Sequence, residues 1–247
     1  MATLSQLVGA LARVSNVPEA TIFAYGRFAR EAGLIAQKGR GRGAAIMSAS
    51  DAANLLIAVG GTDVTREAAP AIHEYRPMKA ASFRNSQETF LEFARWCQPL
   101  GLEPTNELPK SYVERSWRDD LRCVSKGDFG SLVEFLITKA GRDELTPWLA
   151  SLPNAGMETG FLPAIYFVFH RWAPSVSVHL ANGRGTMLEI NFKHKGRLQP
   201  PIGIYSNTTV TNECLTGLGA ALIANADPSS FAVKSISGSR KERPKAL

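Results

Sequence analysis

The beginning of the chain constrains the fold most, because two helical patterns there run directly into a basic, glycine-rich segment. Apolar residues recur at the spacing of one helix face over the first turns. They are Leu4, Leu7, Val8, Leu11 and Val14. This stripe predicts an amphipathic helix that ends near Ser15-Asn16.

A second helix is predicted to begin at Asn16 and to run to Ala32. Asn16 can cap it, Glu19 can close a capping box, and Pro18 is tolerated in a first turn whose N–H groups lack intrahelical partners. Gly33 supplies the stop. At about 100° per residue, one face should pack on the first helix. That face holds Pro18, Ile22, Tyr25, Ala29 and Ala32. The opposite face holds Ala20, Phe23, Ala24, Arg27 and Glu31, with Arg30 at its edge.

Two short apolar segments follow, Leu34-Ile35-Ala36 and Ala44–Met47. A basic, glycine-rich tip at residues 37–43 separates them, which predicts a β-hairpin. Ser48 or Ser50 then caps a third helix over Asp51–Val59, which closes at Gly60-Gly61. A further helix is predicted over Thr62–Tyr75 and a linker near residues 76–81.

The rest of the chain mixes helical patterns with alternating strand patterns, so the fold class is α+β. Helices are expected at Phe83–Trp96, Gly130–Lys139, Asp143–Leu152 and from Thr209 or Thr211 to about Asn225. Strands are expected at Ala164–Trp172, around Val176–Leu180 and Leu188–Phe192, and at Phe231–Ile236. We expect a DNA-binding unit at residues 1–76, an α+β unit at 82–236 for dimerisation or sensing, and a basic flexible tail at 237–247.

The helical pair resembles a known family at particular residues. Leu11–Val17 is similar to the end of a supporting helix and its turn. The stretch from Thr21-Ile22 to Glu31–Ile35 resembles the recognition helix of bacterial winged helix-turn-helix regulators of the MarR and IclR kinds. In those families a Thr-Val or Thr-Ile pair precedes a terminal Glu-Ala-Gly-Leu-Ile run by the same number of residues as in this sequence. The resemblance covers roughly a quarter of the chain. It implies an N-terminal winged helix-turn-helix, DNA binding and transcriptional control, and it does not extend to the C-terminal region.

The chemistry of these residues suits a duplex. Small side chains on the outer face let a helix approach the major groove, and Arg27 can reach a guanine edge or a phosphate. Arg40-Gly41-Arg42 can enter a narrow minor groove, where the negative potential is strongest, and Lys38 adds a phosphate contact. The residues expected to contact DNA are Ala20, Thr21, Phe23, Ala24, Arg27, Arg30, Lys38, Arg40 and Arg42.

Charge supports the same hypothesis. The net charge is +6, and both ends of the chain are enriched in Arg and Lys, a distribution that favours polyanionic partners. Each phosphate that is neutralised releases counterions, so binding should weaken steeply with salt.

The sequence offers no catalytic or metal-binding motif, and we expect neither a cofactor nor a metal. The three cysteines form no CxxC pair, which argues against a zinc knuckle or a disulfide framework. His179 and His194 lie in adjacent predicted strands but have no third ligand. Gly217-Leu218-Gly219 lies within an apolar helical pattern, which favours close helix packing over a dinucleotide loop.

The sequence therefore predicts a double-stranded-DNA-binding transcriptional regulator, with repression the expected outcome and a homodimer on a pseudo-palindrome the expected arrangement. The C-terminal region can also bind an effector or a protein partner. No signal-peptide pattern or bilayer-spanning run is present, so a cytoplasmic, nucleoid-associated location is expected. Three alternatives stay open: a plasmid or phage replication initiator or partition protein, an enzyme with its activity in residues 82–236, and a protein-interaction adaptor.

Overall fold

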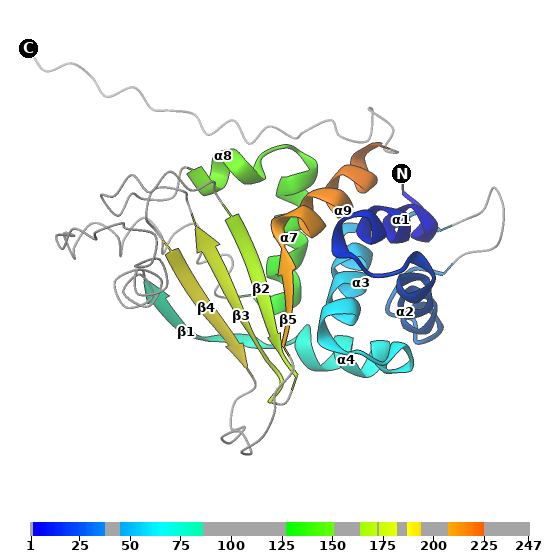
Figure 1. Cartoon of the computed structure of the whole chain (residues 1–247), viewed down its shortest axis with the longest axis horizontal. Coiled ribbons are helices and arrows are strands. Elements are labelled where there is room, and N and C mark those ends of the chain that lie inside the picture. Colours follow the sequence, from blue (N-terminus) through cyan, green and yellow to red (C-terminus); the bar gives the residue numbers. More distant parts are fainter. Residues whose placement is uncertain are drawn as a thin grey trace, which may run out of the picture.

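A computed structural model describes residues 2–37, 45–85, 127–150, 164–171, 173–181, 187–193 and 207–224. A group of helices lies beside a five-stranded sheet (Figure 1). The helices are α1 (Leu4–Ser15), α2 (Glu19–Glu31), α3 (Ala49–Gly61), the 3-10 turn η2 (Thr65–Glu67), α4 (Ala68–Tyr75), α7 (Phe129–Gly141), α8 (Leu145–Ala150) and α9 (Asn212–Ala224). The strands are β1 (Lys79–Asn85), β2 (Ala164–His170), β3 (Ser175–Ala181), β4 (Met187–Lys193) and β5 (Asn207–Thr211). The predicted α+β class is confirmed.

The sheet has the strand order β1-β4-β3-β2-β5, and every neighbouring pair is antiparallel. Successive side chains of a strand point to opposite faces, and burial alternates along β2 accordingly. Phe167 pairs with Val178, which in turn pairs with Ile190, and all three are fully buried. Phe129 of α7 packs edge-on against the Phe167 ring, with centroids 5.7 Å apart. One face of the sheet thus packs against the helices.

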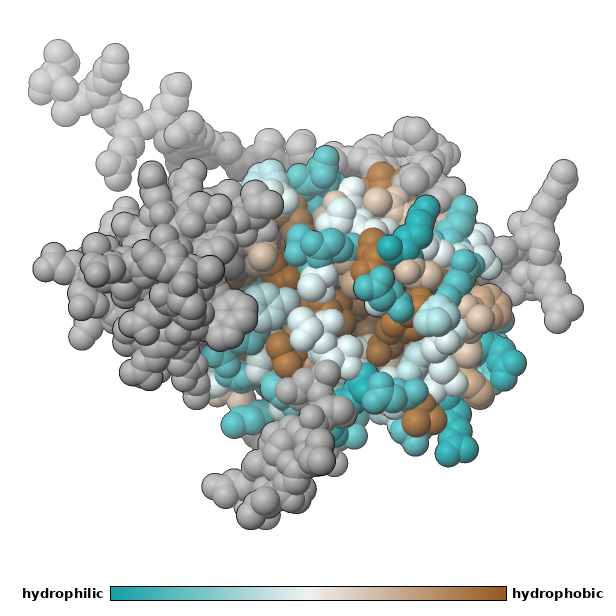
Figure 2. Space-filling model, viewed as in Figure 1, coloured by the Kyte–Doolittle hydropathy of each residue, from teal (hydrophilic) through white to brown (hydrophobic). Residues whose placement is uncertain are grey.

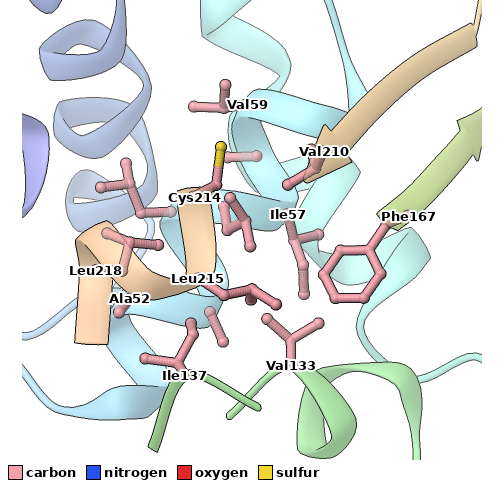
Figure 3. Packing of buried hydrophobic residues seen from close by; sticks show 14 of the residues in the cluster. Ala52, Ile57, Val59, Val133, Ile137, Phe167, Val210, Cys214, Leu215 and Leu218 are labelled. Carbon is pink, nitrogen blue, oxygen red and sulfur yellow. The ribbon is translucent and has the colours of Figure 1, made fainter. Parts of the chain in front are cut away.

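Helix α3 lies at the centre of the helical layer. Every residue from Asp51 to Gly61 is buried, including the polar Asp51 and Asn54, because neighbouring elements cover this mostly apolar helix. It packs against α2, α4 and α7, while α9 packs against α1 and α7. Side chains of α3, α7, α9 and the strands meet in one cluster (Figure 3). Buried residues before and after the predicted boundary at residues 76–81 belong to this cluster.

Arg76 joins this core to α7 through polar contacts. Its guanidinium donates to Asn54 Oδ1 and forms an ion pair with Glu134, and Nη2 lies 3.0 Å from Ser50 Oγ. The Arg76 carbonyl oxygen accepts from the Gly130 N–H at 3.0 Å. These contacts of Arg76 link the end of α4 to both α3 and α7.

Several predicted boundaries are wrong. Asn16 does not cap α2; it ends α1 with a positive φ of 55°, and Pro18 takes the N-cap position of α2. The helix predicted from Thr62 is the turn η2 followed by α4, with Pro70 in the first turn of α4, where its missing N–H costs nothing. Strand β1 replaces the predicted linker and the start of the helix predicted at Phe83–Trp96, because pairing with β4 outweighs local preference. Strand β5 was not expected.

Other predictions fall partly or wholly outside the described residues. The described flanks of the predicted hairpin, residues 34–37 and 45–48, contain no strand. The hairpin tip and the remainder of the helix predicted at Phe83–Trp96 lie outside the described part of the chain, as do the strand predicted at Phe231–Ile236 and the tail at 237–247.

Candidate nucleic-acid interface

The connection between α1 and α2 is a three-residue turn, Asn16-Val17-Pro18. Asn16 adopts the left-handed conformation, which Asn tolerates better than most residues do. The Pro18 carbonyl oxygen accepts from the N–H groups of Thr21 and Ile22 at 2.9 and 3.1 Å, so α2 begins immediately after the turn. A short turn of this kind holds two helices at a fixed angle, as in helix-turn-helix motifs.

The inner face of α2 is fixed to the core, largely as expected. Ile22, Tyr25 and Ala29 are buried, whereas Pro18 and Ala32 of the predicted face are exposed. Pro18 and Ala32 lie outside the helix, at its two caps, where the helical periodicity no longer applies.

Two contacts hold this inner face close to its neighbours. Gly26 faces α1, where an added Cβ would lie 3.0 Å from Leu4 Cδ1. The Tyr25 hydroxyl donates to the Thr62 carbonyl oxygen at 2.7 Å, and burial, with a smaller contribution from Asp63, raises its pKa. The Tyr25 hydroxyl therefore remains a protonated donor, and it ties α2 to the end of α3.

The outer face of α2 is open to solvent. Ala20, Phe23 and Arg27 are exposed, and Phe23 keeps 41% of its surface accessible. The remaining expected contact residues of the helix are half-buried. They are Thr21, Ala24 and Arg30. Phe23 is thus a large apolar side chain that α2 presents to solvent.

Arg27 has local partners on this face. Its Nε lies 3.3 Å from Glu31 Oε1, and its guanidinium carbon lies 4.9 Å from the centre of the Phe28 ring. Both members of the ion pair are more than half exposed, so this pair contributes well under about 1 kcal/mol and can exchange for another anion. The charges of α2 cancel, since Arg27 and Arg30 are matched by Glu19 and Glu31.

The flanks of segment 38–44 are anchored on α3. The Ala36 N–H donates to Asp51 Oδ1 at 2.8 Å, and the Asn54 amide donates to the Leu34 carbonyl oxygen at 2.5 Å. On the returning side, the Met47 N–H donates to the Ala2 carbonyl oxygen at 2.8 Å. Both described flanks therefore lie near the N-terminal end of α3.

The preceding flank also contacts the C-terminal end of α2. The Gln37 side-chain amide donates to the carbonyl oxygen of Arg30, in the last turn of α2. The expected contact residues Lys38, Arg40 and Arg42 lie outside the described residues. Ile46, just after the segment, is 54% exposed and was not singled out from the sequence, although an apolar residue beside a basic tip is a usable signal.

A second polar cluster lies on the sheet face that points away from the helices. Ser177 Oγ donates to Asn191 Oδ1 at 2.7 Å, and the Asn191 amide donates to Glu189 Oε1 at 2.8 Å. The His179 ring stacks on Tyr166 with centroids 4.5 Å apart. Nδ1 of His179 is buried and has no hydrogen-bond partner among the described residues, and burial lowers the pKa of this histidine. Sequence reasoning missed this cluster because only the strand register brings its members together.

Comparison with protein-family models found no match, and neither curated proteins nor solved structures gave one. Within the described ranges, no group of three or more His, Cys, Asp or Glu side chains is placed to hold a metal ion. His194, the expected neighbour of His179, lies outside them. No helix in the described part of the chain has the length and hydrophobicity that crossing a bilayer requires.

Proposed function

We propose that the chain is a sequence-specific, double-stranded-DNA-binding transcriptional regulator that acts as a repressor. In this proposal the chain has a winged helix-turn-helix: α2 lies in the major groove, and segment 37–43 is the wing that enters the adjacent minor groove. The observation that carries the proposal is the division of α2 into two faces. Its inner face is locked onto α1 and α3, while its outer face, with Ala20, Phe23 and Arg27, is open.

The shape of the outer face supports groove entry. The major groove, about 12 Å wide, admits an α-helix. Ala20 and Ala24 add little bulk, so the helix backbone can approach the base edges. Phe23 offers an apolar contact for a thymine methyl group, and Arg27 can exchange its exposed pair with Glu31 for a guanine or a phosphate.

In this proposal the wing, rather than α2, supplies the positive charge that attracts the DNA phosphates. Because the four charges of α2 cancel, the attraction to phosphates depends on Lys38, Arg40 and Arg42. The hydrogen bonds of Ala36 and Met47 hold the described flanks of this segment against Asp51 and Ala2. One such unit covers a short half-site, so a homodimer on a pseudo-palindrome completes the proposal.

Two sets of substitutions test the proposal by gel shift at two salt concentrations. Arg40→Ala with Arg42→Ala should weaken binding to all sequences and reduce the salt slope by about 2. Arg27→Ala should instead relax base preference at one position, at a cost of about 1–3 kcal/mol on the preferred site. The operator itself can be selected from a random-sequence duplex library with the purified full-length chain.

The controls separate charge, size and location. Arg66→Ala removes an exposed arginine from η2 and should leave binding unchanged. Ala20→Glu should abolish binding by placing a carboxylate toward the phosphates, whereas Ala20→Gln adds similar bulk without charge and should weaken it less. Unchanged DNA affinity in both the double arginine variant and Ala20→Glu would refute the proposal.

A further inference from the structure

A cleft of about 600 Å³ opens where α1, α2 and α3 meet β5 and α9. Cavities that bind small molecules span roughly 300–1,000 Å³. Hydrophobic surface is visible between the strands and the helical side near the middle of the molecule (Figure 2). The cleft reaches the α1–α2 turn at Asn16 and the first turn of α2 at Thr21. It therefore lies against the helix that the proposed function places in the major groove.

The floor of the cleft is apolar. Val14 of α1, Val59 of α3 and Val210 of β5 contribute to it, together with Cys214 at the start of α9. Val59, Val210 and Cys214 come together from three separate elements (Figure 3). Burial raises the pKa of the Cys214 thiol, so this sulfur stays protonated and adds to the apolar floor. A hydrocarbon group placed here would be removed from water.

The rim of the cleft is polar, and it includes an exposed carboxylate, that of Glu213 in the first turn of α9. Arg171 forms an ion pair with Asp63 and donates to the Gly60 carbonyl oxygen at 3.4 Å, so both of these charges are engaged within the protein. Glu213 also lines the cleft, and no Lys, Arg or His pairs with it in the described part of the chain. Hydroxyl groups complete the rim. They belong to Ser15, Thr21 and Thr208.

We propose that this cleft binds a small organic amine and that its binding changes the DNA affinity of the protein. The ammonium group lies beside Glu213 and donates to the rim hydroxyls, and the hydrocarbon part covers Val14, Val59 and Val210. The amine-binding part stands by itself, whereas the effect on DNA affinity rests on the proposed function.

The position of the cleft explains how the two sites communicate. Tyr25 lines the cleft and holds α2 to the end of α3 through the Thr62 carbonyl oxygen. A ligand bound between the α1–α2 turn and β5 contacts both α2 and the sheet. Ligand binding therefore stabilises those positions of α2 that make the closest contacts with the ligand. Because DNA also binds some positions of α2 better than others, the ligand changes the DNA affinity.

Calorimetry on the full chain tests the cleft with three probes of one size: 2-phenylethylamine, 2-phenylethanol and phenylacetate. We expect the amine to bind with a Kd of about 1 mM or below, the alcohol more weakly, and the carboxylate not at all. Glu213→Gln should weaken the amine about fivefold and leave the alcohol unchanged. Glu144→Gln, which removes a remote exposed carboxylate from its ion pair with Lys139, should change neither.

A blocking variant provides a second test of location. Thr208 has the same parity in β5 as the buried Val210, so its side chain faces the helices. Thr208→Trp should abolish binding of both the amine and the alcohol, while thermal unfolding confirms that the variant folds. Equal amine binding by Glu213→Gln and the wild type, tighter binding of phenylacetate, or no binding of any probe would overturn the assignment of the cleft.

The effect on DNA is measured separately. Saturating amine should change the affinity for the selected operator at least about threefold in the wild type, and operator DNA must change the amine Kd by the same factor. A protein that binds the amine but no DNA would refute the proposed function and leave the cleft assignment standing. Amine binding that leaves an intact DNA affinity unchanged would overturn the coupling.

Discussion

Gly217 and Gly219, two residues apart in α9, give a matched test of how α9 packs. A Cβ at Gly219 would lie 2.7 Å from the Ile137 carbonyl oxygen and closer still to the Gly141 N–H of α7. Both neighbours are backbone atoms, which no rotamer change can move. Gly141 has the reciprocal constraint, since its Cβ would lie 2.8 Å from the Gly219 carbonyl oxygen. At Gly217 the nearest atom would be the Ala10 carbonyl oxygen at 3.5 Å, an ordinary contact.

The two alanine variants should therefore change stability in opposite directions. Gly219→Ala forces α7 and α9 apart by roughly 1 Å, and overpacking costs up to about 3 kcal/mol. The better helix propensity of Ala returns about 1 kcal/mol, so the net loss is about 2 kcal/mol. Gly217→Ala gains the propensity term without the clash and should stabilise the protein by about 0.5–1 kcal/mol.

Urea denaturation followed by circular dichroism measures both effects. The unfolding midpoint should fall for Gly219→Ala and rise for Gly217→Ala, and the melting temperature of Gly219→Ala should drop by about 4–8 °C. A Gly219→Ala variant as stable as the wild type would show that α7 and α9 can move apart without lowering the free energy of unfolding. The backbone contact would then not be what fixes their distance.

Two further predictions concern a buried histidine and a helix cap. Burial lowers the folded-state pKa of His179, so the unfolded state binds the proton more tightly, and the free energy of unfolding should fall as the pH drops through about 6.5. His179→Gln should flatten this dependence in urea titrations, while His73→Gln, at an exposed position, should not; equal flattening by both would contradict the assignment. Ser48 Oγ accepts from the Asp51 N–H at 3.2 Å at the start of α3, so Ser48→Ala should cost about 1 kcal/mol, and Ser5→Ala on exposed α1 surface should cost much less. Similar losses in the two serine variants would rule out the capping explanation.

The sequence predicted those parts of the fold whose patterns are local. The stripe from Leu4 to Val14 gave α1, the serine before Asp51 gave the start of α3, and alternation around Val176–Leu180 gave β3. Strands β1 and β5 were missed because they lie at the edges of the sheet, are rich in polar residues, and are defined by pairing with β4 and β2. Edge strands carry little pattern of their own, since only one neighbour constrains them.

The candidate sites also divide into those that local sequence patterns predict and those that only tertiary packing creates. The open face of α2 follows from helical periodicity, and Phe23 and Arg27 are exposed as expected. The Gly217-Leu218-Gly219 interpretation as close helix packing is confirmed at Gly219. The cleft could not be predicted, because Glu213, Arg171 and Val14 are distant in sequence and only the tertiary packing of α1, α9 and the sheet brings them together.

The burial of α3 on all sides has a practical consequence for experiments. A fragment ending at residue 76 would strip α3 of its cover from α7 and α1 of its cover from α9. Such a fragment would carry an uncovered apolar flank into solution and should self-associate whether or not it recognises an operator. The intact polypeptide is therefore the right material for every binding measurement.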